Sequence, residues 1–177
     1  VFIGECGLDR WMHKPNIEEQ KKVFISQLAL ASEYNLPISI HCLKAWGTLL
    51  EILKTHHRPQ RGFLLHSYGG SPELVPELAA LGGYFSFSGY FLREEKKKVH
   101  EAFRRIPPDR VMVETDAPDM LPPEPYRKYS LATSATHSLN HPANLLSVVE
   151  GLAKILEIRE SHLRSLVSEN FHSFFPV

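Results

Sequence analysis

The chain has 177 residues, of which 43% are hydrophobic, so it is long enough for one domain with a sizeable core. Twenty basic and twenty acidic residues give a formal net charge of zero, which excludes binding of nucleic acid or an anionic membrane through bulk charge alone. No apolar run approaches the roughly 20 residues that span a bilayer, and the first residues do not resemble a signal peptide. We therefore expect an intracellular protein, cytoplasmic or nuclear, with no membrane partner.

Short apolar runs rich in β-branched residues predict five strands, and apolar residues at helical spacing predict helices between them. The expected strands cover residues 1–4, 36–42, 62–67, 84–89 and 110–113, and residues 5–9 are expected to form a loop. The expected helices cover 16–35, 45–55, 71–81, 94–105, 142–156 and 161–171. The proline-rich stretch 119–141 is too long for a simple connector and is a candidate wall or lid on the substrate side.

Alternating strands and helices predict an α/β protein with a parallel sheet, whose ligands bind at the carboxyl ends of the strands. Polar residues recur at these predicted ends, namely Glu5, His41, His66, Ser86 and Asp116. In an open sheet, strand ends three places apart are separated by about 14 Å and cannot share one small ion. In a barrel, inward side chains from different strands converge on one axis. The charged and imidazole side chains therefore favour a barrel.

Glu5, His41, His66 and Asp116 combine two carboxylates with two imidazoles, a set that suits zinc, manganese or a similar divalent ion, with magnesium also possible. A carboxylate can bridge two metal ions, and such a pair can stabilise the attacking and leaving oxygens of a phosphodiester. Glu114 and Asp116 point the same way from the end of their strand, so they need cations or protons nearby. The competing interpretations are a pair of acids that caps the next turn, and histidines with purely structural roles.

Six strings carry a resemblance to a known family: IGECGLD at 3–9, LPISIHC at 36–42, LHSYGG at 65–70, YFSFSG at 84–89, ETDAP at 114–118 and NHPANL at 140–145. In order and spacing they resemble TatD-type deoxyribonucleases, over nearly the whole chain. The resemblance implies a TIM-type (β/α)8 barrel of the metallo-dependent hydrolase superfamily. It also implies metal-dependent hydrolysis of DNA phosphodiesters, as an exonuclease acting on single-stranded DNA or 3′ ends.

Carried over by position, the resemblance implies that Glu5 is a carboxylate shared by two divalent metal ions and that His41 and His66 bind one of them. Asp116 then binds metal and orients or deprotonates the attacking water. Glu114 does not bind metal itself but contacts the residues that do. The family has an arginine two residues after the histidine of the second string, where this chain has Leu43 and Lys44. The phosphate contact there passes to Lys44 as a less directional charge, or is lost.

Tyr68, Tyr90 and Arg93 are expected to stack on or pair with single-stranded nucleic acid near the carboxyl ends of the strands. Packing at the mouth of the barrel is an equal alternative for Tyr90. No oligomeric state is assigned.

Family members begin with a strand carrying His-x-His and two further βα units, and these are not in the 177 residues. The resemblance therefore implies one hydrolase domain over 1–177, N-terminally incomplete and holding strands four to eight of a partial barrel. An active chain and an inactive truncated product both follow as possible outcomes. The other function that we considered is metal-dependent hydrolysis of another ester or amide, because fold and ligands do not fix the substrate.

Overall fold

The computed structural model describes residues 1–131 and 138–175. Its centre is a five-stranded parallel sheet in which the strands follow one another in chain order. The strands are β1 (Ile3–Asp9), β2 (Ile38–Leu43), β3 (Phe63–Leu65), β4 (Gly83–Ser88) and β5 (Val111–Glu114). The predicted α/β class and parallel sheet are therefore confirmed.

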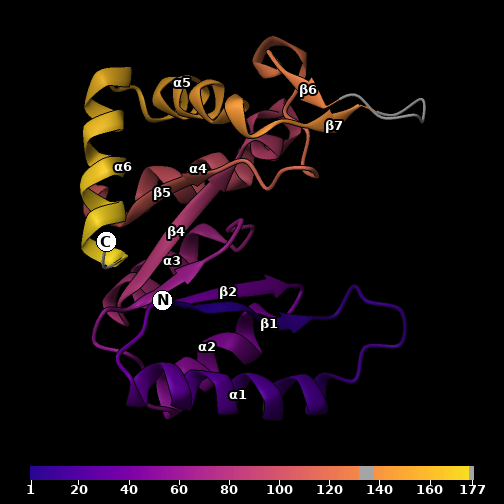
Figure 1. The fold of residues 1–177 in the computed structure, drawn as a ribbon, viewed down its shortest axis with the longest axis vertical. Coiled ribbons are helices and arrows are strands. Elements are labelled where there is room, and N and C mark those ends of the chain that lie inside the picture. Colours follow the sequence, from indigo (N-terminus) through magenta and orange to yellow (C-terminus); the bar gives the residue numbers. More distant parts are fainter. Residues whose placement is uncertain (132–137, 176–177) are drawn as a thin grey trace.

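Helices lie between successive strands and after β5, and they pack mainly on one face of the sheet. They are α1 (Ile17–Glu33), α2 (Trp46–Thr55), α3 (Val75–Ala80), α4 (Lys97–Arg105), α5 (Leu145–Leu156) and α6 (Glu160–Phe174). Figure 1 shows α1 and α2 beside β1 and β2, whereas α5 and α6 lie at the other side of the molecule, where α6 packs against β5. The side chain of Asn16 caps α1 by accepting a hydrogen bond from the Glu19 amide, a role that asparagine favours.

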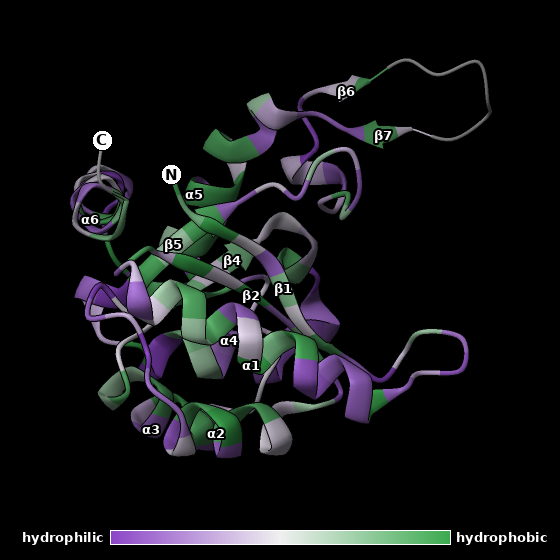
Figure 2. Cartoon of the chain, turned by 60° about the horizontal axis from the view of Figure 1, so that its bottom comes forward, coloured by the Kyte–Doolittle hydropathy of each residue, from purple (hydrophilic) through white to green (hydrophobic). Residues whose placement is uncertain are grey.

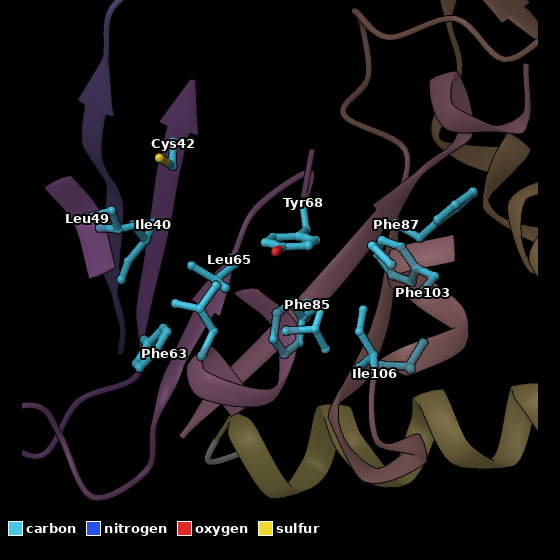
Figure 3. Close-up of a cluster of buried hydrophobic side chains, with 14 of the residues drawn as sticks. Ile40, Cys42, Leu49, Phe63, Leu65, Tyr68, Phe85, Phe87, Phe103 and Ile106 are labelled. Carbon is cyan, nitrogen blue, oxygen red and sulfur yellow. The ribbon is translucent and has the colours of Figure 1, made fainter. Parts of the chain in front are cut away.

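The helix-covered face of the sheet is apolar because alternate strand residues point to it. Ile40, Leu65, Phe85 and Phe87 from three neighbouring strands are fully buried there. Figure 3 shows these side chains with Phe103 of α4. Figure 2 colours the chain by hydropathy and shows β5 as largely hydrophobic, whereas α1 mixes hydrophobic and hydrophilic residues. This packed layer fixes the positions of the strand ends.

The opposite face, which we call the inner face, carries Ser39, His41, Leu64, His66, Tyr84, Ser86, Met112 and Glu114. Toward the amino ends of the strands it is apolar, since Leu64, Tyr84 and Met112 pack against Phe174 from the end of α6. Toward the carboxyl ends it is polar. The sheet is strongly twisted, so that β1 and β2 run across the view of Figure 1 while β4 and β5 rise diagonally.

Strand β1 is longer than the sequence suggests. Residues 5–9, expected to form a loop, belong to the strand because their backbone pairs with β2 as far as Asp9 and Leu43. The ladder is irregular between Ile3 and Cys6. Gly7 allows the two strands to approach closely, since a Cβ atom built on it would lie 1.9 Å from the His41 carbonyl oxygen.

Smaller differences occur elsewhere. The predicted helix 71–81 consists of a 3-10 turn, Pro72–Leu74, followed by α3, and α4 is preceded by the 3-10 turn Glu94–Lys96. The long segment after β5 contains two short antiparallel strands, β6 (Ser130–Leu131) and β7 (Leu139–Asn140). Within the described ranges, no helix has the length and apolarity needed to cross a membrane.

Candidate metal centre

The structure brings Glu5, His66 and Asp116 together on the inner face. Glu5 comes from β1, His66 directly follows β3, and Asp116 lies two residues after β5. His66 Nε2 lies 3.7 Å from Glu5 Oε1 and 3.4 Å from Asp116 Oδ1. Side chains standing upright on a flat sheet would be about 10 Å apart across two strand spacings. Their convergence on one imidazole nitrogen therefore indicates that the inner face is concave.

His41 joins this group through Glu5. Its Nδ1 atom lies 3.1 Å from Glu5 Oε1, the same oxygen that faces His66. Its other ring nitrogen, Nε2, lies 3.1 Å from Asp9 Oδ2. One carboxylate oxygen of Glu5 thus stands beside two imidazole rings, and each nitrogen of His41 faces a carboxylate.

Glu114 holds His66 from the opposite side of its ring. Glu114 Oε2 lies 2.9 Å from His66 Nδ1, and the carboxylate also accepts hydrogen bonds from the hydroxyls of Ser67 and Ser86. The Glu114 side chain is only 16% exposed. A carboxylate on the far nitrogen of a histidine fixes the ring orientation and directs the near nitrogen toward a ligand. Here the near nitrogen, Nε2, points to Glu5 and Asp116.

The histidines and carboxylates of this cluster shift one another's pKa values in opposite directions. Burial opposes protonation of His66, but hydrogen bonds to Asp116 and Glu114 outweigh it and raise its pKa to about 10. The hydrogen bond to Glu5 likewise raises the pKa of His41. In turn, the hydrogen bond from His41 lowers the pKa of Glu5, and that from His66 lowers the pKa of Asp116. The site therefore attracts positive charge.

The donor chemistry fits a divalent ion. Within residues 1–131 and 138–175, no three His, Cys, Asp or Glu side chains form a group arranged to hold an ion. The donor pairs nevertheless lie 3.1 to 3.7 Å apart. Ligands at about 2.1 Å from a tetrahedral ion are separated by roughly 3.4 Å. The residues thus match a metal in type and in pairwise spacing, with Asp9 and Glu114 orienting the two imidazoles.

The predicted substrate-binding residues Lys44, Tyr90 and Arg93 all follow the carboxyl ends of strands. Lys44 is exposed after β2, and its Nζ atom lies 3.7 Å from the ring centroid of Trp11. Tyr90 lies in a 3-10 turn after β4, with the guanidinium carbon of Arg93 at 5.0 Å and Lys96 Nζ at 4.6 Å from its ring centroid. These groups and the candidate centre therefore lie at the same edge of the sheet, the one formed by the carboxyl ends of the strands.

Tyr68 does not lie on the surface, in contrast to the expected role in stacking on nucleic acid. It is 0% exposed, and its ring packs edge-on against Trp46 and Phe85 in the core. Figure 3 shows Tyr68 near Phe85 among the buried side chains. Its hydroxyl donates a hydrogen bond to the Ser71 carbonyl oxygen over 2.8 Å. The physical reason is that Tyr68 follows β3 on the helix side of the sheet, where the apolar layer closes over it.

Sequence reasoning missed Asp9, which contacts His41, and Trp11, whose ring contacts Lys44. Asp9 stands four residues after Glu5 on the same strand, so its side chain points to the same face. That alternation could have identified it, but the assumption of a loop over 5–9 concealed the pattern. Trp11 carried no pattern of its own, since only the folded chain shows that it is 66% exposed beside Lys44.

Comparisons with known proteins identify the chain's relatives. It is 35% identical over 177 residues to the uncharacterized metal-dependent hydrolase YabD of Bacillus subtilis, covering all of this chain and 66% of YabD. It is 30% identical over 154 residues to the 3'-5' ssDNA/RNA exonuclease TatD of Escherichia coli, covering 86% of this chain and 57% of TatD. The chain thus spans between about half and two thirds of the length of these relatives.

The fold agrees with this relationship. The crystal structure of YJJV, a TatD homologue from Escherichia coli, superposes with a TM-score of 0.87 at 25% identity, covering all of this chain and 64% of YJJV. The sequence model of the family described as TatD related DNase matches residues 1–176. The chain therefore belongs to the TatD-related DNase family.

Proposed function

We propose that this chain carries the catalytic centre of a metal-dependent hydrolase of DNA phosphodiester bonds, acting as an exonuclease on single-stranded DNA or 3′ ends. The observation that carries the proposal is the convergence of Glu5 and Asp116, from opposite edges of the sheet, on His66 Nε2. The TatD relative from Escherichia coli, a 3'-5' ssDNA/RNA exonuclease by name, supports the substrate class.

In this proposal two divalent ions (Mg, Mn or Zn) would share Glu5, and His41 and His66 would hold one of them. Asp116 completes the ligands, orients the attacking water and accepts its proton. A bound ion supplies polarisation of the phosphoryl oxygen and stabilises the developing negative charge. Glu114 keeps the ring of His66 in place through its contact with Nδ1. Lys44 and Arg93 contact substrate phosphates, and Tyr90 lies beside the nucleotide chain.

We further propose that residues 1–177 belong to one hydrolase domain, and that β1–β5 correspond to strands four to eight of a (β/α)8 barrel. The curvature of the inner face supports this, because side chains of a barrel converge on its axis. The share of YJJV that the chain covers, 64%, is consistent with five of eight strands.

Hydrolysis of another ester or amide is the second candidate. It is supported by relatives such as YabD, whose name gives a metal-dependent hydrolase without a substrate. The same ligands could serve either reaction. A panel of single-stranded oligonucleotides, nitrophenyl esters and amides, tested with the same preparation, separates the two.

The test measures bound metal and release of nucleotides from a 3′-labelled single-stranded oligonucleotide. It compares this chain with Asp116→Asn, and both with versions extended at the N-terminus by a His-x-His strand. Asn keeps the shape of Asp116 but removes its charge, so hydrolysis should fall at least about 100-fold while the fold is retained. Full activity of Asp116→Asn would remove this residue from the mechanism. Absence of activity in every form, with metal bound, would refute the nuclease.

A further inference from the structure

Trp11 is exposed in a way that its chemistry does not favour. Its side chain is 66% exposed, although tryptophan is one of the more buried residue types on average. It lies in the segment 10–16 between β1 and α1, which projects from the body of the molecule in both Figure 1 and Figure 2. A large aromatic surface presented to solvent near a polar site marks a place where a ligand can stack.

The ammonium group of Lys44 lies over one face of the Trp11 ring. Lys44 Nζ lies 3.7 Å from the Trp11 ring centroid, well within the range of a cation–π contact. Lys44 adopts a left-handed backbone conformation, φ 57°, immediately after β2, and this directs the chain at the end of the strand. The ammonium group occupies one face of the indole, so the other face is the one available to a planar partner.

Asp9 connects the start of the segment 10–16 to the candidate metal centre. Asp9 Oδ1 accepts a hydrogen bond of 2.6 Å from the backbone amide of Trp11, while Asp9 Oδ2 lies 3.1 Å from His41 Nε2. The amide of Arg10 also donates to the Leu43 carbonyl oxygen over 3.0 Å, which extends the pairing of β1 with β2 beyond the strand. One carboxylate therefore separates the Trp11 backbone from a proposed metal ligand.

We infer that Trp11 and Lys44 form a subsite for single-stranded nucleic acid, in which a nucleobase stacks on the free face of Trp11 and Lys44 neutralises the adjoining phosphate. The inference rests on the proposed function and names where its substrate is held. Aromatic stacking tolerates any base, because every base has a π face, and the lysine supplies the charge that the backbone requires. Asp9 sets the position of this subsite relative to His41.

The experiment uses tryptophan fluorescence without catalysis. The chain contains two tryptophans, and Trp46 is partly buried with its ring against Tyr68, so Trp46→Phe makes Trp11 the only tryptophan reporter. The protein is titrated in EDTA with hexathymidylate and, separately, with a hexamer of the same phosphodiester backbone without bases. Variants Trp11→Ala, Trp11→Phe and Lys44→Gln are measured by competition against a labelled oligonucleotide. Tyr34→Ala, which removes an aromatic residue that is 64% exposed after α1, at the opposite ends of the strands, is the matched control.

We expect hexathymidylate to quench Trp11 saturably and the abasic hexamer to leave its fluorescence unchanged. Trp11→Ala should weaken binding about tenfold, with Trp11→Phe recovering most of it. Lys44→Gln should lower the slope of log affinity against log salt concentration by about one. Equal binding of both hexamers, or equal affinity of Trp11→Ala and Tyr34→Ala, would overturn the subsite. Quenching by hexathymidylate, together with absence of hydrolysis in every form of the protein with metal bound, the N-terminally extended form included, would refute the proposed function and leave the subsite standing.

Discussion

The carboxylate of Asp9 faces the ring nitrogen of His41 that points away from Glu5, with Oδ2 3.1 Å from Nε2. This places Asp9 where an orienting group for a metal-binding histidine is needed, because it fixes which nitrogen is presented to the ion. We therefore predict that Asp9→Ala lowers the affinity for Mn²⁺ or Zn²⁺ about 10- to 100-fold, measured by calorimetric titration. Asp9→Asn should lose less, since its amide oxygen can still accept a hydrogen bond from Nε2. An unchanged affinity of Asp9→Ala would show that His41 is held by other means.

Glu5 is predicted to matter more for metal content than any residue on the distant helix α6. Glu5→Gln removes the charge that faces both imidazoles, so bound metal after dialysis should fall severalfold. His162→Ala, an exposed histidine on α6, should leave metal content and activity unchanged. Metal analysis of the purified variants gives the comparison. Equal losses in both would mean that the site has been misidentified.

Glu114 is predicted to stabilise the fold as well as the site. It accepts hydrogen bonds from Ser67 and from Ser86, which is only 1% exposed, so Glu114→Ala leaves a buried hydroxyl without this partner. An unsatisfied buried polar group costs about 1–3 kcal/mol, and urea unfolding should show a loss of that size. Glu101→Ala removes an exposed helix pair with Arg105 and should cost less than about 0.5 kcal/mol. Similar losses for the two variants would contradict this role of Glu114.

The raised pKa of His66 predicts how stability changes with pH when metal is removed. Its pKa is about 10 in the folded chain against 6.5 for an unperturbed histidine, so the folded state holds a proton that the unfolded state has lost between these values. Stability from this group is complete below pH 6.5 and declines as the pH rises toward 10. Glu5, Glu114 and Asp116 are the carboxylates that face the ring and retain the proton.

The measurement is urea unfolding in EDTA between pH 6.5 and about 7.5, below most of the range in which unfolded thiols ionise. This limit is needed because burial raises the pKa of Cys6 to about 11 and of Cys42 to about 12, which adds a slope of the same sign at higher pH. The decline should reach at most about 1.4 kcal/mol per pH unit for one proton, and His66→Gln should reduce it. The raised pKa of His41 contributes the slope that persists in that variant. A flat wild-type profile would contradict the protonated cluster.

The local sequence pattern was sufficient to predict the position of a strand where that strand is a short apolar run with a polar residue at its end. β2 and β5 lie close to their predicted positions because Ile38, Ile40 and Val111 alternate with residues of the inner face. From this alternation, and from the family motifs, came the candidates Glu5, His41, His66 and Asp116, which the fold brings onto one face. Their metal-binding and catalytic roles stay predictions.

Long-range pairing and packing decided the rest. Residues 5–9 alternate as a strand does, but their two acids and two neighbouring glycines favoured a loop, and pairing with β2 makes them a strand. Tyr68 follows a polar strand end, yet Trp46, Phe85 and Phe103 from three other elements enclose it. Neither outcome is encoded in the neighbouring residues, because each depends on partners more than ten positions away in the chain.

The division of the inner face has a consequence for how this protein can change. Phe174 closes the amino half with Leu64, Tyr84 and Met112, whereas the ionisable groups occupy the carboxyl half. Substitutions in the first half act through packing, at a cost of about 3–5 kcal/mol for loss of a buried phenylalanine, and touch no reacting group. Substitutions in the second half alter charge while the apolar contacts persist. Among proteins that descend from this sequence, substitutions in the amino half of the inner face can therefore change thermal stability without changing chemical specificity. Substitutions in the carboxyl half can change specificity without changing the apolar packing.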